Sequence, residues 1–104
     1  MSDPQYFPAF KTSDIPQGKS QAIELDGRDI LVCHSAEGFF AVDNLCSHAM
    51  AKLSEGRLKG NKILCPLHGA AFDIREGSAL TRPAVTPLNS YPVKVEGDEI
   101  FVCV

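Results

Sequence analysis

The 104-residue sequence has no tryptophan and only three histidines, and none of its apolar runs approaches the roughly 20 residues of a membrane-spanning helix. Its first ten residues show neither a basic start nor an apolar stretch of signal-peptide length, so we expect a cytoplasmic protein without a membrane anchor. The formal net charge of −3 is too small to indicate a partner by its sign. Basic stripes with interleaved aromatic residues, which would indicate nucleic-acid binding, are also lacking. These absences leave a small globular protein, which we expect to be a monomer.

Helical periodicity is missing as well, because no window of helical length places apolar residues at i, i+3, i+4 and i+7. Short apolar runs between turn signals instead predict a three-strand meander over residues 21–25, 28–34 and 39–43. A small hairpin is expected over residues 57–65, followed by a short strand in residues 71–75. A second hairpin is expected at the C-terminus, where Tyr91, Val93 and Val95 alternate with other residues in the pattern of one half-buried strand.

This pattern predicts an all-β protein with a single domain over residues 1–104. Its basal part is expected to be an antiparallel, sandwich-like arrangement of strands. Residues 44–76 are expected to form a metal-carrying subdomain inserted into that basal part, because they contain the four residues described next.

Two short cysteine–histidine pairs dominate the middle of the chain. Cys46 and His48 form the first, Cys65 and His68 form the second, and residues 49–64 separate them. Thiolate and imidazole are the ligands of zinc and of iron–sulfur centres. Two cysteines and two histidines also make a good tetrahedral zinc site, so a zinc-stabilised interaction module is an alternative. Zinc motifs more often group cysteine with cysteine and histidine with histidine, whereas each pair here mixes the two.

The arrangement Cys-x-His and Cys-x-x-His, with Gly69 after the second pair, closely resembles the cluster-binding motif of Rieske proteins. This resemblance implies a Rieske fold and one [2Fe-2S] cluster per chain. Cys46 and Cys65 would bind one iron, and His48 and His68 would bind the other.

Within that family the chain most resembles the Rieske-type ferredoxins of bacterial aromatic-ring-hydroxylating dioxygenase systems. The resemblance implies an electron carrier, not an enzyme, which takes one electron from an NAD(P)H-dependent flavin reductase and passes it to a terminal Rieske oxygenase. Such oxygenases add a mononuclear iron held by two histidines and a carboxylate. His34 is the only histidine left for that purpose here, and we expect it to be an ordinary strand residue. A small Rieske subunit of another reductase or monooxygenase system is the alternative within redox chemistry.

Two positions indicate a low reduction potential. Respiratory Rieske proteins resemble this chain but carry a serine and a tyrosine whose hydroxyls donate hydrogen bonds towards the cluster. Ala70 and Phe72 stand at the matching positions here and lack hydroxyls. Fewer donors to the sulfurs leave the reduced cluster less stabilised, so we expect a potential at the low end of the Rieske range.

The remaining cysteines, Cys33 and Cys103, lie in apolar strand-like runs and are expected to be buried free thiols. Small or apolar residues beside the ligands, together with a proline-containing stretch over residues 81–87, are expected to form an apolar docking tip; the flanking residues are Ala49, Met50, Leu67 and Ala70.

Overall fold

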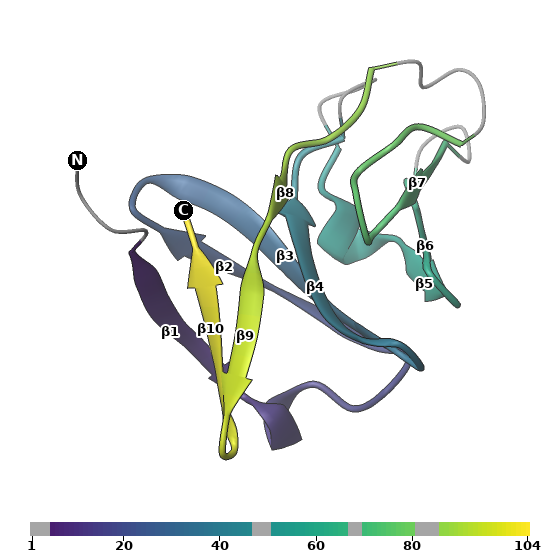
Figure 1. Cartoon of the computed structure of the whole chain (residues 1–104). Coiled ribbons are helices and arrows are strands. Elements are labelled where there is room, and N and C mark those ends of the chain that lie inside the picture. The colour runs from purple at the N-terminus through teal and green to yellow at the C-terminus, as the bar shows by residue number, and fades with distance from the viewer. Residues whose placement is uncertain (1–4, 47–50, 67–69, 81–85) are drawn as a thin grey trace.

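The computed structural model describes residues 5–46, 51–66, 70–80 and 86–104, in which the strands form three antiparallel sheets (Figure 1). The first sheet has the order β1 (Tyr6–Lys11), β10 (Glu99–Cys103), β9 (Val93–Glu96). The second has the order β2 (Ser20–Leu25), β3 (Arg28–Ser35), β4 (Gly38–Asp43), β8 (Ser90–Tyr91). The third has the order β5 (Arg57–Lys59), β6 (Lys62–Leu64), β7 (Ala71–Asp73). Two short 3-10 turns, η1 (Thr12–Asp14) and η2 (Leu53–Glu55), lie between strands. The expected all-β class is confirmed.

The predicted meander is also confirmed. β2 pairs with β3 from Ser20↔Cys33 to Leu25↔Arg28, and β3 pairs with β4 from Ile30↔Asp43 to Ser35↔Gly38. The β2–β3 turn has positive φ at Asp26 (52°) and Gly27 (79°). Two positive φ values are the requirement of a type I′ hairpin, which explains why Asp-Gly was a reliable turn signal.

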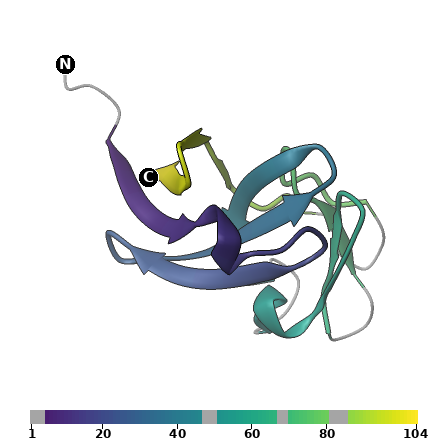
Figure 2. The same cartoon turned by 90° about the horizontal axis from the view of Figure 1, so that it is seen from below.

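β3 separates two hydrophobic cores because both of its faces are covered. Ile30 and Val32 pack with residues of the first sheet such as Ile100, and the two sheets face each other in Figure 2. Leu31 and Cys33 point to the opposite face and belong to a second core that contains residues of the third sheet. All four side chains are fully buried. A strand buried on both faces reads as a continuous apolar run, which is the pattern of this segment.

The C-terminal prediction was wrong in one respect. Residues 91–96 do not form one half-buried strand, because the chain changes sheet at Pro92, between β8 and β9. Proline has no N–H to continue a ladder, while its carbonyl oxygen accepts a bond of 2.9 Å from the Cys103 N–H. Beyond the break Val95 is 44% exposed instead of half-buried.

Two elements were not predicted from the sequence. β1 contains Pro8, and its pairing with β10 shifts register between Pro8 and Phe10, so it shows no regular alternation. η2 is a single turn with one buried residue, Leu53. The third sheet lies within residues 44–76, although the division into basal part and insert stays a prediction. In the described ranges no helix is long and apolar enough to cross a bilayer.

Candidate metal centre

Cys46 is bonded to a residue on the far side of the first predicted ligand pair. Its N–H donates to the carbonyl oxygen of Ala51 at 2.9 Å, which closes the loop that contains His48. One step further from the loop, Leu45 and Lys52 form an antiparallel bridge. Backbone contacts therefore hold residues 45–46 against residues 51–52, on either side of the first predicted ligand pair.

Cys65 stands at the mouth of a second loop built in the same way. Its N–H donates to the carbonyl oxygen of Ala70 at 2.7 Å. The ladder continues into the third sheet as Leu64↔Ala71 and Ile63↔Phe72. In both loops the cysteine amide bonds to the residue five positions later, so both predicted pairs lie in loops of equal length.

The structure brings the two cysteines into one environment. Cys46 is 4% exposed and Cys65 is 3% exposed, and both belong to the second core, beside β3. Both loops close on a buried alanine, Ala51 or Ala70. The other two predicted ligands, His48 and His68, lie outside the described residues.

This arrangement fits a metal cluster. Thiolates buried in an apolar core are unfavourable unless a cation compensates their charge, whereas a bound metal deprotonates a thiol and neutralises the charge locally. Two loops that each present a buried cysteine at the mouth supply two sulfur ligands from separate chain segments.

Cys33 shares the second core but differs in its chemistry. It lies inside β3, and burial raises the pKa of its thiol to about 12, so it is a neutral thiol at physiological pH. The expectation of a buried thiol is confirmed for Cys33. It is wrong for Cys103, a free thiol that is only half-buried because it lies at the end of β10, after the buried Val102.

His34 is a strand residue, in agreement with the prediction. Its Nδ1 lies 2.8 Å from the carbonyl oxygen of Ile15, and its ring stacks on Phe39 with centroids 3.9 Å apart. These contacts occupy the side chain in joining β3 to the segment after η1.

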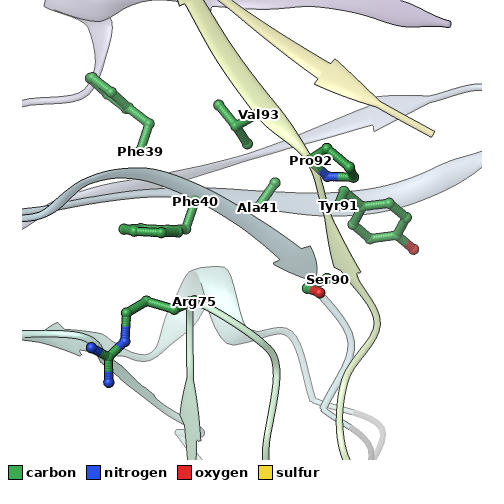
Figure 3. Close-up of a pocket in the computed structure, with 8 residues that line it drawn as sticks. All are labelled: Phe39, Phe40, Ala41, Arg75, Ser90, Tyr91, Pro92 and Val93. Atoms are coloured by element: carbon green, nitrogen blue, oxygen red, sulfur yellow. The ribbon is translucent and has the colours of Figure 1, made fainter. Parts of the chain in front are cut away.

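A groove lined by residues of β4, the segment from β8 to the start of β9, and Arg75 contains neither of the two cysteines (Figure 3). Phe39 and Phe40 point to opposite sides of β4, and Arg75 approaches from the side of the third sheet. Arg75 donates to both carboxylate oxygens of Asp73, at 3.0 and 2.8 Å, and these bonds hold the pKa of Asp73 below its usual value. It also lies 3.5 Å from Glu37 in the β3–β4 turn, so this ion pair joins the two sheets.

Comparison with known proteins assigns the cofactor. The family model described as the Rieske [2Fe-2S] domain matches residues 5–92. The chain belongs to the Rieske family. It therefore carries one [2Fe-2S] cluster, and the zinc alternative is wrong.

Relatives and solved structures narrow the branch of the Rieske family. The 3-phenylpropionate/cinnamic acid dioxygenase ferredoxin subunit of Escherichia coli (strain K12) is 40% identical over 96 residues, covering 90% of this chain and 89% of that protein. The ferredoxin of carbazole 1,9a-dioxygenase from Nocardioides aromaticivorans IC177 has a TM-score of 0.90 at 34% identity, covering 93% of this chain and 95% of that one.

A third similar structure is a complex of reduced oxygenase and oxidised ferredoxin in carbazole 1,9a-dioxygenase. Its matching chain has a TM-score of 0.90 at 30% identity, covering 97% of this chain and 94% of that one. Rieske proteins of this kind are ferredoxin components, so the chain is an electron carrier and not a catalytic oxygenase.

The Rieske cluster is expected to have a midpoint potential of roughly −150 mV, the low end of the family range. Ala70 and Phe72 are both fully buried in the core that holds Cys65, so hydroxyl donors are missing from a dry environment. The Ala70→Ser variant is expected to raise the potential by tens of millivolts, since about 59 mV corresponds to 1.4 kcal/mol for a one-electron couple. Protein-film voltammetry measures both values.

Ala71→Ser is the matched control for that experiment. Ala71, the first residue of β7, is also buried, but unlike Ala70 it does not belong to the core that contains Cys65. A wild-type midpoint above about +100 mV would contradict the low-potential assignment. An equal rise of the midpoint potential in both serine variants would show that the hydroxyl does not act through a hydrogen bond directed at the cluster.

Proposed function

We propose that Cys46, His48, Cys65 and His68 hold the cluster and that the chain passes single electrons from an NAD(P)H-dependent flavin reductase to a terminal aromatic-ring-hydroxylating oxygenase. The observation that supports the ligand set most strongly is the matched pair of loops, each closed by its own cysteine amide. The cluster supplies a one-electron redox centre when bound.

The residues of the chain have distinct tasks in this proposal. Cys46 and Cys65, deep in the second core, bind the iron that stays ferric. His48 and His68, in the loops themselves, bind the iron that changes valence. The apolar residues around the cysteines exclude water from the sulfur side of the site, while the two loop backbones keep both cysteines in place.

The partners follow from the relatives. The carbazole complex, in which an oxygenase holds a ferredoxin, supports a terminal Rieske oxygenase as electron acceptor. A flavin reductase is the matching electron donor because NAD(P)H gives electrons in pairs and the cluster accepts them singly. We place the exchange in the cytoplasm, where that NAD(P)H is produced, with the carrier acting as a monomer.

The proposal is tested by mixing the chemically reduced chain with the oxidised oxygenase encoded nearest to it in its genome. We expect the oxygenase to be reduced by one electron per chain in a stopped-flow absorbance trace. The reductase encoded nearby should in turn reduce the chain with NAD(P)H. A chain that neither accepts electrons from that reductase nor donates them to that oxygenase would overturn the assigned pathway.

Two exposed leucines flank the proposed ligand loops. Leu45, 43% exposed, directly precedes Cys46. Leu80, 45% exposed, is joined to the second loop because its N–H donates to Ala71 at 2.8 Å. Ala70, which was expected at the docking tip, is fully buried, whereas Ala49, Met50 and Leu67 lie outside the described residues. We therefore assign Leu45 and Leu80 to the docking surface.

Leu45→Lys is expected to slow electron transfer to the oxygenase about tenfold, the effect of about 1.4 kcal/mol on association. The reason is that a charge replaces apolar area beside the site, while the cluster and its potential stay unchanged. Stopped-flow rates at limiting concentrations measure the effect. Val95→Lys is the matched control, because Val95 is equally exposed but lies on β9, in the first sheet. Equal slowing in both variants would contradict a local docking surface.

A further inference from the structure

Asn44 is a fully buried polar residue two positions before Cys46, with only 1% of its surface exposed. Its backbone N–H donates to the carbonyl oxygen of Asp29 at 3.0 Å, and its carbonyl oxygen accepts from the Leu53 N–H at 2.6 Å. Its side-chain oxygen accepts from the Ser54 N–H at 2.8 Å, and its side-chain nitrogen donates to Asp29 Oδ1 at 3.1 Å. Asn44 therefore joins three segments: the strand entering the first loop, the start of β3 and the turn η2.

The orientation of this amide is determined by its neighbours. Ser54 offers an N–H, so the atom that faces it is an acceptor, the amide oxygen. The amide nitrogen then faces the Asp29 carboxylate, whose other oxygen lies 3.6 Å from Lys52 Nζ. Lys52 itself bridges Leu45 at the neck of the first loop. The two chain segments that meet at the Leu45–Lys52 bridge thus both contact Asp29, one through Asn44 and the other through Lys52.

The turn η2 connects the segment around Asn44 to the second loop. Figure 1 shows η2, the teal turn, between the second and third sheets. Its buried residue Leu53 belongs to the core shared by both cysteines. At its other end, Gly56 approaches Leu64 so closely that a Cβ atom would overlap the Leu64 carbonyl oxygen. Leu64 directly precedes Cys65, so η2 is in backbone contact with the necks of both loops.

We propose that Asn44 is a positioning residue for the cluster: acting through η2, it sets where the Cys46 loop lies relative to the Cys65 loop. The inference rests on the proposed ligand set, because it assumes that both cysteines bind the cluster. A buried amide with both of its polar ends bonded suits this task, since the loss of either partner leaves a desolvated group unpaired. An apolar residue at position 44 would fill the same volume but would make no directed bond to Asp29 or to Ser54.

Four variants test the proposal. Asn44→Ala removes both side-chain bonds. Asn44→Asp keeps the acceptor for Ser54 but sets a carboxylate against Asp29. The double variant Asn44→Asp with Asp29→Asn reverses the donor and acceptor and restores the bond. Asn61→Ala is the matched control, because Asn61 also donates a side-chain bond, of 2.7 Å to Glu37, but lies in the β5–β6 turn, at the end of β6 opposite to Cys65.

The measurements are the electron paramagnetic resonance spectrum of the reduced protein and the rate at which the isolated holoprotein loses iron. Asn44→Ala and Asn44→Asp are expected to shift or broaden the spectrum and to lose iron about tenfold faster, the usual effect of removing an outer partner of a metal site. The double variant is expected to recover the wild-type spectrum and retention. Asn61→Ala should match wild type in both.

A purely structural role would lower the melting temperature of Asn44→Ala while leaving the spectrum of the folded holoprotein unchanged, and that result would overturn the proposal. Failure of the double variant to recover the spectrum of Asn44→Asp would overturn it as well. Failure of the ligand set is a separate result: a Cys46→Ala protein that retains a normal cluster would refute the ligand assignment whatever the Asn44 variants show.

Discussion

Replacing Cys46 or Cys65 by alanine is expected to reduce bound iron from two atoms per chain to nearly none, with loss of the visible absorption and of the electron paramagnetic resonance signal. Each change removes one of the two proposed sulfur ligands from the core that both cysteines share. Because a water molecule cannot replace a thiolate in that apolar setting, partial retention is not expected. His48→Ala and His68→Ala are expected to have the same effect. Iron and sulfide analysis of purified protein gives the answer directly.

The remaining cysteines provide matched controls. Cys33→Ala alters the same core, yet its neutral thiol is not among the proposed ligands, so the variant should keep two irons and a normal spectrum. Cys103→Ala changes a half-buried position on β10 and should also retain the cluster. A normal cluster in Cys46→Ala or Cys65→Ala, or loss of iron in Cys33→Ala without unfolding, would refute the ligand assignment.

Gly56→Ala is expected to be strongly destabilising although it adds only one methyl group. The new Cβ would overlap the Leu64 carbonyl oxygen, a backbone atom that cannot rotate away. Overpacking at such a contact costs about 3 kcal/mol. For a protein of this size that lowers the melting temperature by more than about 10 °C. Because the collision separates η2 from the strand before Cys65, the holoprotein should also lose iron faster.

Gly60→Ala distinguishes collision from the general cost of replacing glycine. Gly60 has φ +62° and no atom within 4 Å of a built Cβ, so only backbone strain opposes the change. That strain amounts to about 1–2 kcal/mol. Calorimetry of both holoproteins, with iron analysis before and after heating, measures the difference. A Gly56→Ala protein as stable as Gly60→Ala would show that the close approach to Leu64 is relaxed without cost.

The sequence predicted those features that depend on neighbours along the chain. Asp26-Gly27 identified a hairpin because its backbone requirement is local, and the two cysteine–histidine pairs identified the cofactor because ligand type and spacing are local too. β1 was missed because its only partner in the sheet is β10, at the opposite end of the chain. Its proline and bulge removed the alternation that would have indicated a strand.

The supporting residues of the site were missed for a different reason. In the sequence, Asn44 is a polar residue at a strand end, a place where asparagine commonly faces solvent. Its burial follows only from the way Asp29, η2 and the first loop meet. The importance of Gly56 likewise depends on a contact with β6 and not on its own φ, which is negative. Such roles depend on tertiary contacts, and one sequence does not contain a local sign of them.

The strand buried on both faces has a consequence for how fast this carrier can exchange electrons. Ile30 and Leu31 are successive residues of β3, yet Ile30 belongs to the core shared with the first sheet and Leu31 to the core that contains Cys46 and Cys65. Because β3 belongs to both cores, a rearrangement of one core would disturb the other. Closely packed interiors resist such displacement. Little nuclear motion should therefore accompany a change of redox state. A low reorganisation energy, and hence fast electron exchange, is the expected consequence.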